Sequence, residues 1–312
     1  MKNLLLGAMA LLATTIMFGQ TQTGNGNSLT ATPNGINTWQ TDQTGNYNDI
    51  DIFQVGSGND GKIIQGNLSQ PSHRNSSSLT QMGNDNYSCI EQIGNENDGD
   101  VNQIGNYNTN YGYQDGNDND LEVDQFGDFN FSESEQVGNR NEADANQIGN
   151  DNVSLFLQLG NFNDVDVDQI GDQNVSDVFQ NGNRNSSDIY QFGDRNVALN
   201  EQTGNRNISS IEQRGDDNLS LAQQIGNRNN NLSLQEGNRN YDDIYQQGNN
   251  NSVDVKQYGN DNKNTTLQTK NNGTATVLQV GNQNCAKIIQ STSNGQVAWI
   301  TQTGNFNFAC IQ

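Results

Sequence analysis

The sequence repeats with a period of 11 residues, and this period constrains the fold more than any other feature. Between Gln81 and Gln290, twenty glutamines recur at this interval, and eighteen of them begin the hexad Gln-x-Gly-x-x-Asn. A unit of 11 residues is too short to bury a core by itself, so successive units must stack on one another. The period therefore predicts a repeat architecture rather than an ordinary globular domain.

The residues between successive hexads alternate in polarity. With the glutamine as position 0, position 9 is Ile or Val in eleven of the nineteen complete units and is never acidic. Position 8 is Asp or Glu in nine units and is never Ile or Val. This alternation predicts a short, half-buried strand in which positions 7, 9 and 0 face inward and positions 6, 8 and 10 face outward.

Each hexad is expected to close a corner of the chain. The glycine at position 2 can adopt a positive φ, and the Asn or Asp beside it tolerates the left-handed region. Two units, 22 residues, then form one rung of two strands and two corners, and rungs stack about 4.7–4.8 Å apart. The predicted fold is all-β, a two-sheet β-solenoid in which each unit of 11 residues is half of a rung.

The inward glutamines and asparagines are expected to form ladders. A buried amide without partners costs about 1–3 kcal/mol, but identical amides in stacked rungs can donate to one neighbour and accept from the other. The predicted glutamine ladder comprises Gln81, Gln92, Gln103, Gln114, Gln125, Gln136, Gln147, Gln158, Gln169, Gln180, Gln191, Gln202, Gln213, Gln224, Gln235, Gln246, Gln257 and Gln279. The asparagine ladder at position 5 includes Asn86, Asn97, Asn141, Asn152, Asn163 and Asn174. The corner glycines include Gly83, Gly94, Gly105, Gly138, Gly149, Gly160, Gly171, Gly193, Gly226 and Gly281.

The chain divides into three parts by sequence pattern. Residues 1–20, with Lys2 followed by apolar and small residues, predict a secretory signal that is cleaved near Gly19 or Gln20. Residues 21–80 are expected to hold degenerate repeats with a leader and an insertion around His73, and residues 81–312 the regular solenoid. No further apolar run approaches the roughly 20 residues that span a bilayer, so the mature chain is predicted to lack a transmembrane segment.

Charge and residue usage exclude several classes of function. The formal net charge of −22 argues against nucleic acid as a partner, because phosphates require a basic surface. The single histidine, His73, has no accompanying nucleophile, metal cluster or phosphate-binding loop. We therefore predict no enzyme, no catalytic or metal site and no cofactor. Cys285 and Cys310 are expected one rung apart, either as a disulfide or as free thiols.

Two outward-facing sets of charges each have two interpretations. Stacked carboxylates, such as those of Asp164 and Asp166, either keep the chain soluble or bridge rungs through calcium. Arginines recur at corner position 4, where they either compensate local acidic charge or form a strip that binds a glycan or a surface; these are Arg140, Arg184, Arg195, Arg206, Arg228 and Arg239.

The hexad followed by a second glutamine resembles the curlin repeat of curli subunits. It is seen in residues 136–147 and 279–290. The resemblance implies a chain secreted through an outer-membrane pore of a Gram-negative bacterium and assembled from a nucleator subunit into amyloid fibres on the cell surface. Such fibres serve adhesion and the biofilm matrix. Curlins usually alternate the hexad with a different second corner, whereas nearly every half-rung carries it here.

The end of the sequence also favours a self-assembling chain. Residues 308–312 have the pattern of a strand without a polar cap, and an uncovered strand edge is a template for another chain. The alternative interpretation is a secreted monomeric stalk of an adhesin, stiffened by calcium.

Overall fold

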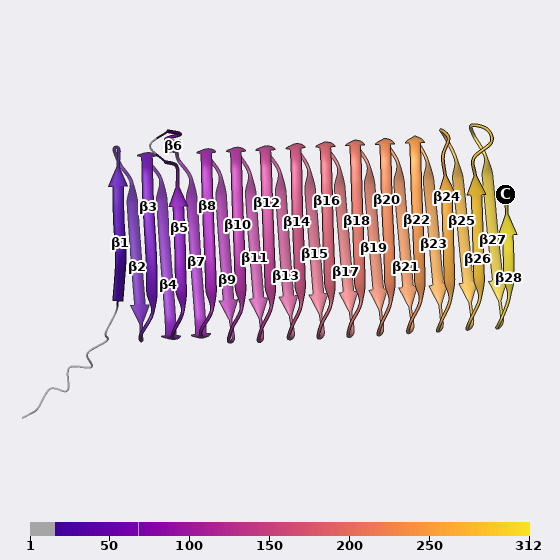
Figure 1. The fold of residues 1–312 in the computed structure, drawn as a ribbon, viewed down its shortest axis with the longest axis horizontal. Coiled ribbons are helices and arrows are strands. Elements are labelled where there is room, and N and C mark those ends of the chain that lie inside the picture. The colour runs from indigo at the N-terminus through magenta and orange to yellow at the C-terminus, as the bar shows by residue number, and fades with distance from the viewer. Residues whose placement is uncertain (1–15, 68) are drawn as a thin grey trace, which may run out of the picture.

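The computed structural model of the protein, which describes residues 16–67 and 69–312, is a two-sheet β-solenoid (Figure 1). Successive strands, apart from β5 and β6, alternate between two sheets that face each other, and the strands within each sheet are parallel. The predicted fold class is therefore confirmed. The described residues form no helix that is long and apolar enough to cross a membrane.

The first sheet has fifteen strands. They are β1 (Ile16–Thr23), β3 (Thr38–Asn46), β5 (Asp60–Gln65), β6 (Ser72–His73), β8 (Tyr87–Asn95), β10 (Thr109–Asn117), β12 (Phe131–Asn139), β14 (Val153–Asn161), β16 (Val175–Asn183), β18 (Val197–Asn205), β20 (Leu219–Asn227), β22 (Tyr241–Asn249), β24 (Lys263–Gln268), β26 (Cys285–Gln290) and β28 (Phe308–Ile311).

The second sheet has thirteen strands. They are β2 (Ser28–Asn34), β4 (Asp49–Ser57), β7 (Ser76–Asn84), β9 (Asp98–Ile104), β11 (Asp120–Phe126), β13 (Glu142–Ile148), β15 (Asp164–Ile170), β17 (Ser186–Phe192), β19 (Ile208–Arg214), β21 (Asn230–Glu236), β23 (Ser252–Tyr258), β25 (Thr274–Val280) and β27 (Val297–Thr303).

From β7 to β26 the register pairs each residue with the one 22 positions later, and the last pairs, β25 with β27 and β26 with β28, have an offset of 23. Thus β12 pairs with β14 through Gln136 and Gln158, and β13 pairs with β15 through Gln147 and Gln169. Like residues therefore lie on like residues over the whole regular stack. A shift of one residue would turn every inward side chain outward, so the alternating pattern fixes this register.

The corners are closed by two residues with positive φ. Gly138, at position 2, has a φ of 131°, and a Cβ there would lie 1.8 Å from the carbonyl oxygen of Gly160 in the next rung. The second is at position 4, where Arg140 and Phe162 have φ of 57° and 58°. The Asn or Asp at position 3, which was expected to tolerate the left-handed region, does not adopt it; the residue after it does.

The insertion in the N-terminal part restores the corner geometry at its end. The insertion near residue 73 ends in β6, where Ser72 and His73 pair with Gly45 and Asn46 and so replace the usual Gly-Asn pair of a corner. Arg74 then takes the left-handed conformation, with φ 58°. Strands β1 to β5 continue the same two sheets. β1 begins at Ile16, within the predicted signal; residues 1–15 of that segment lie outside the described residues, and the signal stays a prediction.

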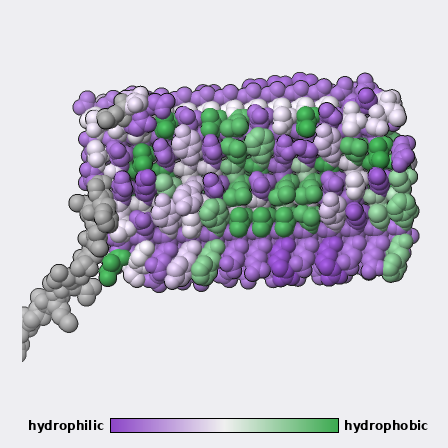
Figure 2. Space-filling view, viewed as in Figure 1, coloured by the Kyte–Doolittle hydropathy of each residue, from purple (hydrophilic) through white to green (hydrophobic). Residues whose placement is uncertain are grey.

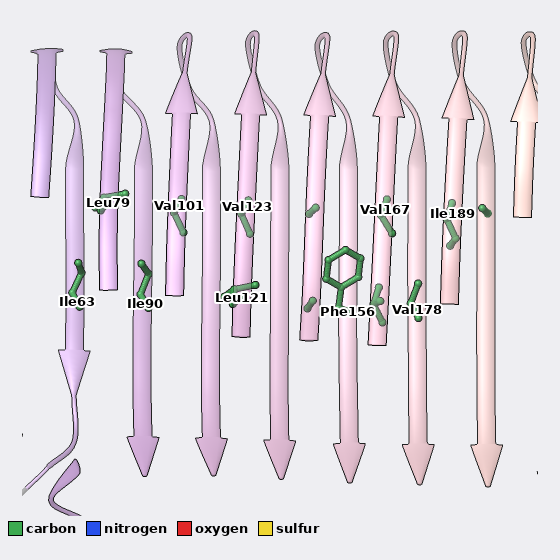
Figure 3. Close-up of a cluster of buried hydrophobic side chains, with 14 of the residues drawn as sticks. Ile63, Leu79, Ile90, Val101, Leu121, Val123, Phe156, Val167, Val178 and Ile189 are labelled. Carbon is green, nitrogen blue, oxygen red and sulfur yellow. The ribbon is translucent and has the colours of Figure 1, made fainter. Parts of the chain in front are cut away.

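A thin core separates the two sheets. Val101 and Ile189 of the second sheet and Ile90 and Val178 of the first sheet point into the space between the sheets (Figure 3). Two apolar clusters line the interior, one from Trp39 to Ala222 and one from Ile244 to Ile300. The break between the two clusters contains buried polar residues, namely Ser220, Asn231, Ser233 and Asp242.

We predict that Gly160→Ala destabilises the solenoid by about 2–5 kcal/mol, the sum of backbone strain and overpacking. Its φ is 123°, and the added Cβ would lie 1.9 Å from the carbonyl oxygen of Gly182. Gly99→Ala is the matched control, because Gly99 has no positive φ and the added Cβ would come no closer than 3.1 Å to another residue. Urea unfolding followed by circular dichroism measures both; equal midpoints would contradict the account of the corner.

Candidate functional site: stacked amide ladders

The predicted ladder glutamines are all fully buried. Gln158 Nε2 donates one hydrogen bond to Gln180 Oε1 in the next rung, at 3.1 Å, and one to the backbone oxygen of Glu142 in the opposite sheet, at 2.8 Å. Gln180 repeats both bonds with Gln202 and Asp164. Each interior amide of these columns therefore links its rung to the next and one sheet to the other.

The asparagines at position 5 are also buried and join corners between rungs. The backbone N–H of Asn163 donates to Asn141 Oδ1 in the preceding rung, at 3.0 Å. Asn163 Nδ2 donates to the backbone oxygen of Gly182 in the following rung, also at 3.0 Å. The asparagine thus satisfies the carbonyl of a corner glycine, which connects the two most regular features of the hexad.

A third ladder lies at position 3, where we expected only turn-forming residues. The backbone N–H and Nδ2 of Asn139 both donate to Asn161 Oδ1, at 3.0 and 2.9 Å. On the other edge of the solenoid, the backbone N–H of Asp172 donates to Asp194 Oδ1 at 2.9 Å. The signal in the sequence was the restriction of this position to Asn or Asp in nearly every unit.

The two corner ladders explain why Asp is accepted at position 3 and not at position 5. At position 3 the side chain need only accept a hydrogen bond from a backbone N–H, which a carboxylate does as well as an amide. At position 5 it must also donate to a glycine carbonyl, which an ionised carboxylate cannot do. The hexads accordingly carry Asn at position 5 throughout.

We predict that Asn163→Asp destabilises the solenoid by about 1–3 kcal/mol, because a buried carbonyl loses its donor. Asn238→Asp should change stability little, since Asp172, Asp194 and Asp216 occupy the same column naturally and the Asn238 side chain only accepts a hydrogen bond, from the backbone N–H of Asp216. The free energy of unfolding of both variants, measured at pH 7, tests the distinction. Equal losses for the two would contradict it.

The residue Asp242 is a buried carboxyl group in the polar break of the core. It accepts hydrogen bonds from Ser233 Oγ at 2.6 Å and from Asn264 Nδ2 at 2.7 Å. Burial raises its pKa to about 7, although these two hydrogen bonds favour the charged form and by themselves would lower the pKa. Sequence reasoning placed only small or modest residues at this inward position and did not single out the acid.

We predict that stability falls as pH rises from about 4 to about 7, in part through Asp242. Its pKa in an unfolded chain is about 3.9, so in this window the folded state holds a proton that the unfolded state has lost. Asp242→Asn should be more stable than the native chain at pH 8 and similar near pH 4. Asp51→Asn, at an exposed position on the distant strand β4, is the control. Identical pH profiles of unfolding for the native chain and Asp242→Asn would contradict the prediction.

The outer faces of the two sheets differ in character. Strands β14 to β20 of the first sheet carry outward Val153, Leu155, Val197, Leu199 and Leu221, and Figure 2 shows apolar side chains gathered over the middle of one broad face. Strands β9 to β17 of the second sheet carry outward carboxylates instead. Burial, and after it repulsion from neighbouring carboxylates, raises the pKa of Asp100 to about 6 and that of Asp144 to about 7.

The remaining candidate groups do not converge on a reactive centre. In the part of the chain that the structure describes, no three His, Cys, Asp or Glu side chains are arranged to hold a metal ion. Cys285 and Cys310 are free thiols. They lie on neighbouring strands, but the register pairs Cys285 with Phe308 and Cys310 with Lys287, so the two are offset by two residues.

A family model of the curlin associated repeat matches the chain at six places. The matched residues are 73–105, 94–127, 138–171, 160–193, 182–215 and 237–264, which together cover just over half of the chain. The protein belongs to the curlin-repeat family. The family and the β-solenoid fold are structural rather than catalytic. A search of curated proteins found no match.

Proposed function

We propose that this curlin-repeat protein is the structural subunit of a secreted, curli-like amyloid fibre that supports adhesion and the biofilm matrix at the cell surface. The observation that carries the proposal is the uniform direction of the amide ladders. Because interior rungs of the regular stack offer the same donors on one side and the same acceptors on the other, the stack has no built-in limit to its length.

The ladders specify how copies would add. Gln158 Nε2 donates toward the higher-numbered rung, and the backbone N–H of Asn163 donates toward the lower-numbered one. A copy added head to tail continues both ladders and the parallel backbone pairing. A copy added in reverse would place donors against donors, so head-to-tail growth is the geometry that satisfies the buried groups.

The high negative charge fits a subunit that assembles after export. Repulsion between chains of net charge −22 would keep them apart and soluble in transit. Membership of the curlin-repeat family supports self-assembly and a fibre at the cell surface. A nucleator subunit and an outer-membrane pore as partners, and a Gram-negative bacterium as the source, stay predictions. No catalytic role is proposed for the glutamines, asparagines and corner glycines, which act as structural groups.

We predict that replacing Gln158, Gln180 and Gln202 together with Glu slows fibre growth at least tenfold. The change removes three donors and stacks three carboxylates about 4.8 Å apart inside the solenoid. A matched control places the same three charges on exposed glutamines, as Gln173→Glu, Gln247→Glu and Gln283→Glu. Thioflavin fluorescence and electron microscopy follow growth of both variants.

Two outcomes would contradict the proposal. Equal growth of the ladder variant and the control would show that the amide ladders do not drive assembly. If the native chain without its predicted signal stays monomeric at high concentration, the fibre proposal fails and the monomeric stalk is the remaining interpretation.

A further inference from the structure

One corner of the solenoid carries an arginine strip, Arg184, Arg206 and Arg228, in three successive rungs. The three residues follow β16, β18 and β20, at the upper edge in Figure 1, and all are exposed. None forms an ion pair with another described residue. On the opposite corner, by contrast, Arg195 pairs with Asp217 and Arg239 with Asp261, each at 2.7 Å.

The surroundings of the arginine strip supply no compensating charge. The three corner segments, 181–186, 203–208 and 225–230, contain no Asp or Glu. The side chains line an open groove of about 720 Å³ together with a row of corner asparagines. At one end Phe162 lies between the guanidinium groups of Arg140 and Arg184, 5.4 and 5.3 Å from its ring centre. Three unpaired cations, about 4.8 Å apart, therefore stand on a strongly acidic protein.

The outer face of the second sheet carries the opposite charge with the same spacing. Glu122, Asp144, Asp166 and Asp188 are register partners in four successive rungs, and we call them the acidic strip. A shallow hollow is lined by the three aspartates of this strip and by the neighbouring Glu142 and Asp164. Among the described residues none of the four forms an ion pair with Lys or Arg, so their charges repel one another.

We propose that the arginine strip of one copy docks on the acidic strip of a second copy lying alongside it, so that solenoids associate laterally. Because both strips repeat with the rung spacing, three arginine–carboxylate pairs form at once when the copies are staggered by two or three rungs, roughly 10–14 Å. A polyanion with another spacing would match only one arginine at a time. The inference rests on the proposed fibre for its role in bundling, although the contact itself needs only the solenoid.

The docked strips differ from each other, so the contact is heterologous. Each solenoid keeps a free acidic strip after using its arginine strip, and the association can continue into ribbons or bundles. At physiological ionic strength charges are screened beyond about 8 Å. Net repulsion between distant parts of two acidic rods is then weak, while the charges in contact still attract.

A pair of charge-reversed variants tests the contact. One carries Arg184→Glu, Arg206→Glu and Arg228→Glu, and the other Asp144→Lys, Asp166→Lys and Asp188→Lys. We expect each variant alone to form single filaments in electron micrographs, because like charges then face each other. Mixing the two preformed filaments should restore bundles, since the intact strip of each meets an oppositely charged strip of the other.

Charge-neutralising variants and a control distinguish loss of the lateral contact from misfolding of the charge-reversed variants. Arg184→Gln, Arg206→Gln and Arg228→Gln, or Asp144→Asn, Asp166→Asn and Asp188→Asn, should reduce the bundled fraction at least fivefold without changing thioflavin growth rates. The same change at the ion-paired arginines Arg74, Arg195 and Arg239 should leave bundling unchanged. Bundles that persist in the Arg184/206/228→Gln variant would place the lateral contact elsewhere, for instance on the apolar face, and would overturn the proposal.

The remaining outcomes separate this proposal from others. Bundling that needs an added acidic polysaccharide, and is lost with the arginine strip, would identify a glycan site and overturn the contact between copies. If the native chain forms no filaments, the fibre function fails, but sedimentation of the two charge-reversed variants as soluble chains still decides the contact. A faster-sedimenting species only in the mixture supports it, and its absence contradicts it.

Discussion

The structure depends on one constraint, that a buried amide must find hydrogen-bond partners. A core this thin cannot compensate for unsatisfied polar groups with apolar area, so every glutamine at position 0 needs a donor and an acceptor at fixed distances. Gln180 finds them in Gln158, Gln202 and the backbone of Asp164. The parallel register, the spacing of 22 residues and the glycine corners all serve to bring like amides over one another.

This constraint divides each unit into a fixed interior and a variable exterior. Position 0 keeps its amide in every unit from Gln81 to Gln290, and position 5 in all but the units of Gln268 and Gln290, because a change disturbs the rungs on both sides. The outward positions are free to vary, and the protein uses this freedom to separate charge and apolar surface. Val197 and Leu199 lie on one broad face, Asp144 and Asp166 on the other, and Arg206 at a corner. Rungs that share one backbone geometry and one set of buried amides can in this way present different surfaces to other molecules.

Much of the fold could be predicted from the sequence because the same pattern of polar and apolar residues recurs in each unit. The alternation of Val and Asp in residues 164–168 gave the strand and its inward face, and the period of 22 gave the register. The left-handed residue at position 4 could not be predicted, since Arg140, Phe162 and Gln173 share no side-chain property there; the stacking of the backbone imposes the conformation. The role of position 3 was missed because a turn and a ladder favour the same Asn and Asp.

The sequence read along the chain also did not predict which arginines form ion pairs. Arg195 and Arg206 occupy the same position of the hexad, yet only Arg195 has an acid 22 residues away, at Asp217. Paired and unpaired arginines are distinguished by comparing residues 22 positions apart, which stack on one another, and not residues that are adjacent in the chain. Asp242 was missed for a similar reason: its burial follows from the register, but its raised pKa follows from the particular neighbours Ser233 and Asn264 and from the break in the core.

The central claim is that stacked amides hold successive rungs together, both within one chain and between chains. A high-resolution electron cryo-microscopy structure of fibres grown from the chain without residues 1–20, the predicted signal, tests it most directly. The account predicts an uninterrupted parallel stack in which the glutamine Nε2 of each rung lies within hydrogen-bond distance of Oε1 in the next, including the rungs where two copies meet. Fibres in which copies meet in antiparallel orientation, or with equivalent amides out of hydrogen-bond reach, would contradict it.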